Sequence, residues 1–312
     1  SGTKIVGAVK GKDYTLVLTN TAAYVIQFVG PPFIFSVRQV GSNCGAIGQH
    51  SIKYVNGAVY WMGEAGGFFV YDGTVKSLPC LVEDFVFTTK GSNLGINYQN
   101  GESVYAGLYT LYEEITWFYP KSGSDNVDRC VTFNYQSNTW TTGSLARTTY
   151  VDANLYDEPY ATEFISDGTP TFPTIQGVTN INGATTYYAH EVGVNQVDSS
   201  GNKTAIPAFI QSGDFDLTVG GDGQVFMSMR RFVPDFKQIQ GNARITINLK
   251  DYPSDAASSS PLGPFTITSS TDKVDTRARS RFASLKVENT STDENWRYGT
   301  FRADIQPDGM RG

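Results

Sequence analysis

The apolar and polar positions of residues 56–73, NGAVYWMGEAGGFFVYDG, follow the pattern of two short antiparallel strands around a tight turn. Residues 59–62 form one apolar run and residues 68–71 form a second. The segment EAGG between them is rich in turn residues, and Asp72-Gly73 closes the return strand. We therefore predict a hairpin that is buried on both faces.

The same pattern recurs along the chain, at residues 15–30, at residues 115–143 with a longer polar tip, and in weaker form at residues 184–197. Corresponding strand positions are separated by 44, 57 and 70 residues, counted along Leu16, Tyr60, Trp117 and Tyr187. The first step matches the length of a four-stranded propeller blade, and the later steps require insertions. A β-propeller-like domain of irregular repeats is the fold that this spacing favours.

Residues 129–144, RCVTFNYQSNTWTTGS, resemble the end of a kelch-type blade, in which an apolar strand, a polar turn and a tryptophan follow one another. We expect Trp140 to wedge between neighbouring sheets, and Trp61 and Trp117 to join it in the propeller core. The alternative is that all three are ordinary core residues of a sandwich. One short helical turn is expected at residues 83–87.

The composition is that of a folded β protein, with 40% apolar, 17% charged and 13% aromatic residues and 32 glycines among 312 residues. The formal charge of −6 argues against a dedicated nucleic-acid binder, which would carry a basic footprint. Cys44, Cys80 and Cys130 are widely spaced and show no CxxC pairing, so we predict buried thiols formed in a reducing compartment. No apolar run is long enough to span a membrane. We expect that the beginning of a longer protein is missing before Ser1.

The character of the sequence changes near the GGDG stretch, where we predict the boundary between a propeller-like domain of residues 1–221 and a β-sandwich domain of residues 222–312. The first part holds 11 basic and 19 acidic residues, which gives a net charge of −8. The second part holds 13 basic and 11 acidic residues, which gives a net charge of +2. The two parts together account for the total of −6. Strands are predicted in the second part at residues 225–232, 243–249, 265–268, 274–287 with a break, and 296–305.

Arginines recur at every second position in the second part, at Arg277, Arg279 and Arg281, so a strand there would project all three from one face. Together with Arg230 and Arg231 they form a candidate subunit interface. Three interpretations stay open for the row: internal pairing with acids such as Asp275 and Asp304, contact with carboxylates of another subunit, or contact with backbone phosphates.

The sequence contains few residues or motifs that could form a catalytic site. Only His50 and His190 are available as imidazole bases, and the GxSxG, HExxH and Asp-box motifs are absent. The adjacent acids in the pairs Glu113-Glu114 and Asp157-Glu158 would point to opposite faces of a strand, so neither pair alone suits a glycosidase. The glycine-rich stretch at residues 41–50 lacks the GK[ST] ending of a phosphate loop. We predict that the protein is not an enzyme and holds no cofactor.

An acidic cluster in the irregular stretch of residues 148–174 is the one candidate metal site. It contains Asp152, Asp157, Glu158, Glu163 and Asp167, which offer the oxygen ligands that Ca²⁺ prefers. Because no DxDxDG spacing organises them, a solvated acidic loop is favoured over a metal site.

Several segments of the chain together resemble the tail nozzle, tail tubular or packaged-DNA stabilisation proteins of short-tailed bacteriophages. The resemblance is carried by FIFSVRQVGSNCGAIGQHSIKYVNGAVYWMGEAGGFFVYDG, DRCVTFNYQSNTWTTGSLART, SGDFDL with MRRFVPDF, and VDTRARSRFASLKVENTSTDENWRYGTFRADIQPDGMRG. These pieces span most of the chain from Phe33 onward, but residues 152–174 do not fit the pattern.

The resemblance implies a structural virion protein, made in the bacterial cytoplasm, that forms a homo-oligomeric ring, expected to be a hexamer, in the tail. Such a ring would contact other tail proteins (an adaptor, a fibre or a spike), extend the DNA channel, retain the packaged genome and let double-stranded DNA pass without binding it specifically. Two alternatives remain: a carbohydrate- or receptor-binding propeller that stacks Tyr and Trp on sugar rings, and a glycan hydrolase. Exposed Trp and Tyr side chains in a groove would favour the carbohydrate- or receptor-binding role.

Overall fold

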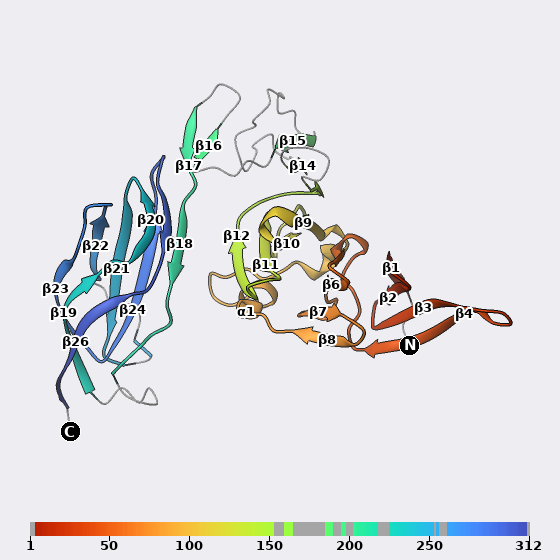
Figure 1. Ribbon diagram of the computed structural model, residues 1–312, viewed down its shortest axis with the longest axis horizontal. Coiled ribbons are helices and arrows are strands. Elements are labelled where there is room, and N and C mark those ends of the chain that lie inside the picture. Colours follow the sequence, from red (N-terminus) through yellow and green to blue (C-terminus); the bar gives the residue numbers. More distant parts are fainter. Residues whose placement is uncertain are drawn as a thin grey trace. The chain divides into compact units, whose positions relative to one another are not determined.

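The computed structural model describes residues 4–152, 159–164, 185–189, 195–197, 202–217, 225–252, 254–255 and 261–310. The described chain is almost entirely β-structure, and it separates into two compact units, Ser1–Glu191 and Val192–Gly312 (Figure 1). Its helices are short, and none in the described residues has the length and apolar character of a membrane span.

The described residues of the first unit contain three four-stranded antiparallel sheets, each formed by four strands that are consecutive in the sequence. Their strands are β1 (Ile5–Lys10), β2 (Thr15–Thr19), β3 (Ala22–Gly30) and β4 (Ile34–Ser42); β5 (Ile52–Val55), β6 (Ala58–Met62), β7 (Phe68–Tyr71) and β8 (Val75–Leu78); and β9 (Tyr105–Tyr109), β10 (Glu114–Tyr119), β11 (Arg129–Asn134) and β12 (Thr139–Gly143). This repeated meander is the organisation of propeller blades. The predicted propeller-like repeats are therefore confirmed.

Short helical turns and a smaller sheet complete the described part of this unit. They are η1 (Gln49–Ser51), α1 (Glu83–Phe87), η2 (Tyr98–Ser103) and η3 (Thr110–Tyr112), with the three-stranded sheet β13 (Thr149–Val151), β14 (Tyr160–Phe164) and β15 (Thr185–Ala189). The helical turn at α1 agrees with the prediction. The weak hairpin predicted at residues 184–197 is wrong, because β15 pairs with β14 whereas β16 (Asn195–Val197) pairs with β17 (Lys203–Ala205).

The hairpin of β6 and β7 forms as predicted, with Val59 opposite Tyr71 and Met62 opposite Phe68. It is preceded by the turn Asn56-Gly57, where φ is 49° and 87°. Left-handed backbone at both positions is what a tight hairpin turn of type I′ requires, and Asn-Gly is the pair that adopts it at the lowest cost. Trp61 and Met62, on opposite faces of β6, are both fully buried, so the hairpin is covered on both faces.

The three tryptophans of the first unit connect successive sheets. Trp61 and Trp117 are fully buried, and Trp140 is half-buried against the same core. Each indole N–H donates to a backbone carbonyl next to the preceding sheet: Trp61 to Cys44 at 2.8 Å, Trp117 to Ser51 at 2.8 Å and Trp140 to Pro79 at 2.9 Å. Burial of an indole is favourable when its N–H finds a partner, so these contacts hold adjacent sheets together.

Trp140 lies where the second and third sheets meet. Its ring centroid is 4.6 Å from that of Phe68 on β7 and 4.6 Å from that of Phe133 on β11. It also stacks on Trp117 at 6.1 Å. The side chain therefore occupies the position between neighbouring sheets that its place in the sequence indicated.

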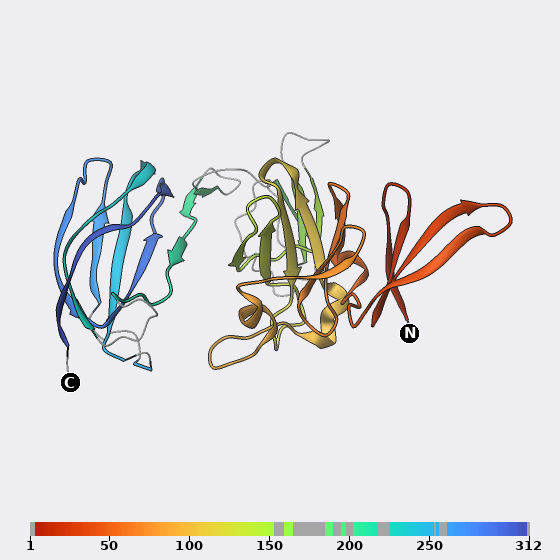
Figure 2. The same cartoon turned by 60° about the horizontal axis from the view of Figure 1, so that its bottom comes forward.

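The second unit is a sandwich of two antiparallel sheets in the described residues, extended by two short strand pairs (Figure 2). One sheet has the order β18-β24-β21-β22 and the other β23-β19-β26, with β20-β25 and β16-β17 as the pairs. Their bounds are β18 (Ala208–Gln211), β19 (Val225–Val233), β20 (Phe236–Gln240), β21 (Ala243–Lys250), β22 (Leu262–Ile267), β23 (Val274–Ser280), β24 (Phe282–Asn289), β25 (Asn295–Tyr298) and β26 (Arg302–Met310).

The core of the sandwich lies between the inner faces of these two sheets. Met227, Met229 and Phe232 from β19 pack in one buried cluster with Ile245 of β21 and Leu285 of β24. Along β21, Ala243, Ile245 and Ile247 are buried and the residues between them are less so, as the two-residue period of a strand requires. The sandwich-like fold predicted for the C-terminal part is thus confirmed.

The division between the units differs from the predicted boundary at residues 221 and 222, since the second unit begins at Val192. The reason is strand pairing: β18 lies at the edge of the second unit's sheet, with Ala208 opposite Asn289 of β24. Ser212 continues this contact through a 2.9 Å bond from its N–H to the carbonyl of Leu285. The GGDG stretch marks a change of composition and does not coincide with the division.

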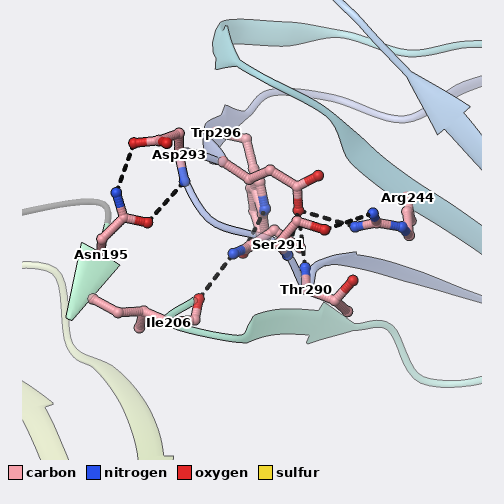
Figure 3. A network of polar contacts seen from close by, with 9 residues as sticks. Asn195, Ile206, Arg244, Thr290, Ser291, Asp293 and Trp296 are labelled. Carbon is pink, nitrogen blue, oxygen red and sulfur yellow. Dashed lines mark hydrogen bonds and ion pairs between the residues drawn. The ribbon is translucent and has the colours of Figure 1, made fainter. Parts of the chain in front are cut away.

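A polar network fixes the first segments of the second unit to its sandwich (Figure 3). Asn195 donates to the carboxylate of Asp293 at 2.7 Å and accepts from its backbone N–H at 2.7 Å. Asn289 donates to the carbonyl of Ile206 at 2.8 Å and accepts from the indole of Trp296 at 3.1 Å. These contacts explain why residues well before the predicted boundary belong to the sandwich.

Candidate functional site

The outer face of the β23-β19-β26 sheet carries the predicted arginines. Along β23, Thr276, Ala278 and Ser280 are buried and the residues between them are exposed. Arg277 and Arg279 therefore project from the outer face, as the spacing of two predicts. We call the hollow that they border the arginine groove; it has a volume of about 500 Å³ and is lined by Ser228, Met229, Arg230, Asp275, Thr276, Arg277, Ala278, Arg279 and Asp308.

Arg279 is held by its own chain. Its Nε donates to Asp308 at 2.7 Å and one terminal nitrogen donates to the Asp308 carbonyl at 3.1 Å. Its guanidinium also lies 4.2 Å from the ring centroid of Phe226, a cation–π distance. These contacts orient Arg279 along the groove while about half of its side chain stays exposed.

Arg281 departs from the predicted row. It lies between Ser280, the last residue of β23, and Phe282, the first of β24, where the chain crosses from one sheet to the other. The side chain is half-buried, with its guanidinium 4.9 Å from the Phe226 ring and 5.4 Å from that of Tyr252. Its Nε is buried without a hydrogen-bond partner among the described residues. Arg281 thus packs beside the exposed row instead of extending it.

Arg230 and Arg231 are both exposed because the register of β19 shifts at this point against both neighbouring strands. Arg231 pairs with Asp304 of β26 at 3.4 Å, an acid that the sequence offered instead as a partner for the row Arg277, Arg279 and Arg281. Arg230 and Arg277 form no ion pair within the described residues. Two guanidinium groups at the groove are therefore available for planar, bidentate contact with a carboxylate or a phosphate.

A second hollow, the first-unit cleft, has a volume of about 790 Å³. It is lined by residues of β1 and by the helical turns that precede β5 and β9: Lys4, Ile5, Val6, Asn20, Ile47, Gly48, Gln49, His50, Glu64, Tyr98, Gln99, Gly101 and Glu102. Lys4 donates to the Glu102 carboxylate, and this bond lowers the pKa of Glu102. His50 stacks on Tyr105 with 5.4 Å between ring centroids.

The other candidate residues lie apart. Glu113 adopts a left-handed turn conformation before β10, and Glu114, the first residue of β10, has its pKa raised by burial. Asp152 accepts hydrogen bonds from the backbone N–H and the hydroxyl of Thr110. The other acids of its cluster, namely Asp157, Glu158, the side chain of Glu163 and Asp167, lie outside the described residues, as does His190. The residues that the structure describes contain no group of three His, Cys, Asp or Glu side chains that could hold a metal ion.

The three cysteines are free thiols. Cys44 and Cys130 are buried as predicted, whereas Cys80 is half-buried beside the sheet interface. Burial raises the pKa of the Cys80 thiol to about 11 and that of Cys130 to about 12. Both thiols are therefore protonated and unreactive near neutral pH.

Comparison with known proteins gives only distant structural likeness. No family model and no curated protein matches the chain. Among solved structures, the N-terminal domain of Nup159 is similar with 11% identity and a TM-score of 0.29, over 67% of this chain and 53% of that one. Trypanosoma rangeli sialidase in complex with sialic acid is similar with 8% identity and a TM-score of 0.29, over 89% of this chain and 64% of the enzyme. The chain thus spans less than two thirds of either protein, and likeness at this level carries no argument about function.

Proposed function

We propose that this chain is a structural subunit of a short-tailed bacteriophage tail, in which copies assemble as a ring around the DNA channel. The ring acts as a nozzle that retains the packaged genome and permits its ejection. The chain has no cofactor in this role, and its partners are further copies of itself and other tail proteins. Its place is the virion, after synthesis in the bacterial cytoplasm.

The arginine groove is the observation that carries this proposal. Arg230 and Arg277 reach it without an ion-pair partner among the described residues of their own chain. A planar guanidinium fork suits a carboxylate on another subunit, and such pairs also fix the register between subunits. Head-to-tail contacts of one surface with a different surface generate rings when the rotation closes.

The charge balance also supports a channel wall. With a formal charge of −6 the chain as a whole repels DNA, so a polyanion can pass without being held. Contact of the arginine groove with DNA phosphates is the alternative use of the same guanidinium groups. If the groove contacts DNA, the chain should have an affinity for duplex DNA that falls steeply as the salt concentration rises. If the groove is a subunit contact, no such affinity is expected.

The test is the double variant Arg230→Ala/Arg277→Ala, which removes the two unpaired guanidinium groups. We expect a folded monomer whose assembly, followed by light scattering, requires a higher protein concentration than that of the wild type. Arg302→Ala is the matched control, because Arg302 is an exposed arginine of the same unit that pairs with Asp235 and does not line the groove. Assembly of the double variant at the wild-type concentration would rule out the groove as a subunit contact.

A carbohydrate- or receptor-binding role is the second candidate, and the first-unit cleft is the feature that favours it. Tyr98 lines the cleft and is 46% exposed, so its ring is available to stack on a sugar. Against this role, all four tryptophans lie in described residues and none is exposed. Glycan-array binding that Tyr98→Ala abolishes would support the second role, and turnover of a polysaccharide would support a hydrolase instead.

A further inference from the structure

The outer half of the β3–β4 hairpin, residues 27–37, is an apolar arm. Figure 2 shows it extending beyond the other strands of the first unit. Phe28, Phe33 and Phe35 are 65%, 81% and 59% exposed, and Val29, Ile34 and Val37 are exposed as well. No charged residue occurs from Tyr14 to Val37. A contiguous apolar, uncharged surface of this kind is unusual on a protein that stays alone in water.

The arm is exposed because the sheet ends before the hairpin does. β2 pairs with β3 only as far as Ile26, so the arm is a two-stranded ribbon in which Phe28 is opposite Phe35. These two rings meet edge to face at 5.8 Å. Residues adjacent along each strand point to opposite faces, and Val29 and Ile34 are exposed like their neighbours, so both faces of the ribbon are apolar.

The area of the arm is large enough to matter for assembly. If a phenylalanine side chain offers about 200 Å², the three phenylalanines together expose about 400 Å². An equal area on an acceptor brings the total to about 800 Å², against about 1,200 Å² or more for a specific interface. Docking of the arm on an acceptor thus supplies a large part of the area that a specific interface needs.

The backbone of the arm indicates what kind of partner covers it. β4 is the last strand of its sheet, nine residues long, and carries Arg38 as its one charge. An open strand edge presents unpaired N–H and C=O groups, which are costly in lipid and which another strand satisfies. With Arg38 as the one charge on β4 and none on the arm itself, nucleic acid is a poor partner. A protein with a free strand edge is the partner that fits.

The described part of the chain offers such an edge on β18. This strand ends its sheet, and its four residues are exposed, including Phe209 at 67% and Ile210 at 54%. Both of its faces therefore present apolar side chains beside an open edge. These are the features that β4 and the arm would require of an acceptor.

We propose that the apolar arm of one copy docks on a neighbouring copy, where the edge of β4 pairs with the edge of β18. This inference rests on the proposed ring, and it names the contact that joins successive subunits. Because the arm and β18 are different surfaces, the contact is head-to-tail and can repeat around a closed ring.

The first test is the full chain with Phe33→Ser and Val37→Lys. A lysine on an edge strand blocks pairing, and both positions are exposed, so we expect the variant to keep the wild-type circular dichroism spectrum and melting temperature. We expect assembly by light scattering to require about tenfold more protein, or more, because the central contact of the interface is lost. Leu81→Ser is the matched control, since Leu81 is 92% exposed and lies outside the arm.

The second test identifies the acceptor. Two versions of the chain that differ in mass, one with Val37→Cys and the other with Ile210→Cys, are mixed under mild oxidation. We expect a mixed disulfide between the two chains, and none when Leu81→Cys replaces Val37→Cys. Absence of the mixed disulfide in assembled rings would overturn β18 as the acceptor.

The outcomes distinguish failure of the arm contact from failure of the proposed ring. Rings formed by the arm variant at wild-type concentration would overturn the arm contact and leave the proposed function intact. A wild-type chain that stays monomeric would contradict both. Binding of the wild-type monomer to phosphatidylcholine vesicles, lost in the arm variant, would assign the arm to lipid and overturn the inference.

Discussion

Replacing Glu294 by glutamine tests how the second unit is held together. The Glu294 side chain is 3% exposed, and one of its carboxylate oxygens accepts three hydrogen bonds, whose donor residues are labelled in Figure 3. The donors are Arg244 at 2.9 Å and the backbone N–H groups of Thr290 at 3.0 Å and Ser291 at 2.8 Å. Glu294→Gln keeps the shape of the side chain and removes its charge.

The expected loss follows from these three bonds. A hydrogen bond to a charged group contributes about 2 kcal/mol and a neutral one about 1 kcal/mol, so three bonds lose about 3 kcal/mol in total. The side chain of Arg244 is 24% exposed, so water can compensate part of its loss. We therefore expect the free energy of unfolding of this unit to fall by about 2 kcal/mol, which lowers its melting temperature by about 8 °C.

The pH dependence of this loss has a definite sign. Burial raises the pKa of Glu294, but the hydrogen bonds from Arg244, Ser291 and Thr290 outweigh burial and bring the pKa below its ordinary value of 4.5. The charged form therefore stabilises the folded state above pH 4.5, and this stabilisation is lost as the pH falls through the lowered pKa. The difference in free energy of unfolding between wild type and Glu294→Gln should have its full size at pH 7 and should become smaller below pH 4.5.

Differential scanning calorimetry at pH 7 and at a series of acidic pH values measures both effects. Asp293→Asn is the matched control, because the neighbouring Asp293 is exposed to solvent and water can replace much of its carboxylate's contacts with Lys203 and Asn195. Two results would refute this role of Glu294. One is a loss in free energy of unfolding for Glu294→Gln at pH 7 that is no larger than that for Asp293→Asn. The other is a loss for Glu294→Gln that is unchanged at pH 3.

Two further predictions concern the first unit. Trp140→Leu should lower the free energy of unfolding of this unit by about 3 kcal/mol, because the indole fills the space between Phe68 and Phe133. Trp140→Phe should lower it by less. Equal losses for the two variants in chemical denaturation would argue against this packing role. Cys80 and Cys130 should resist iodoacetamide at pH 7.5 in the folded chain and react fully in guanidinium chloride, because burial raises the pKa of both thiols. Rapid modification of both thiols in the native chain, detected by mass spectrometry, would contradict the raised pKa values.

The sequence predicted those features that short-range patterns determine. The β6–β7 hairpin follows from two apolar runs around a glycine-rich turn, and the position of Trp140 follows from a strand and turn that come just before it. Local alternation likewise placed Arg277 and Arg279 on an exposed face. In each case the pattern lies within a segment of a few residues, so its structural consequence does not depend on distant partners.

Features that depend on long-range pairing were missed. β18 joins the second unit because it pairs with β24, which follows it by more than seventy residues, and no local signal marks that partner. Arg281 leaves the exposed row because the chain changes sheets there, although the spacing of two continues through it. The apolar pattern of the arm does not distinguish an exposed ribbon from a buried strand, because the exposure results from β2 being too short to cover it.

Electron microscopy of the purified chain, at concentrations where light scattering detects assembly, tests the central claim most directly. The account predicts closed rings with an axial opening wide enough for duplex DNA. A chain that remains monomeric at every concentration, or that forms only open filaments or two-fold dimers, would contradict it.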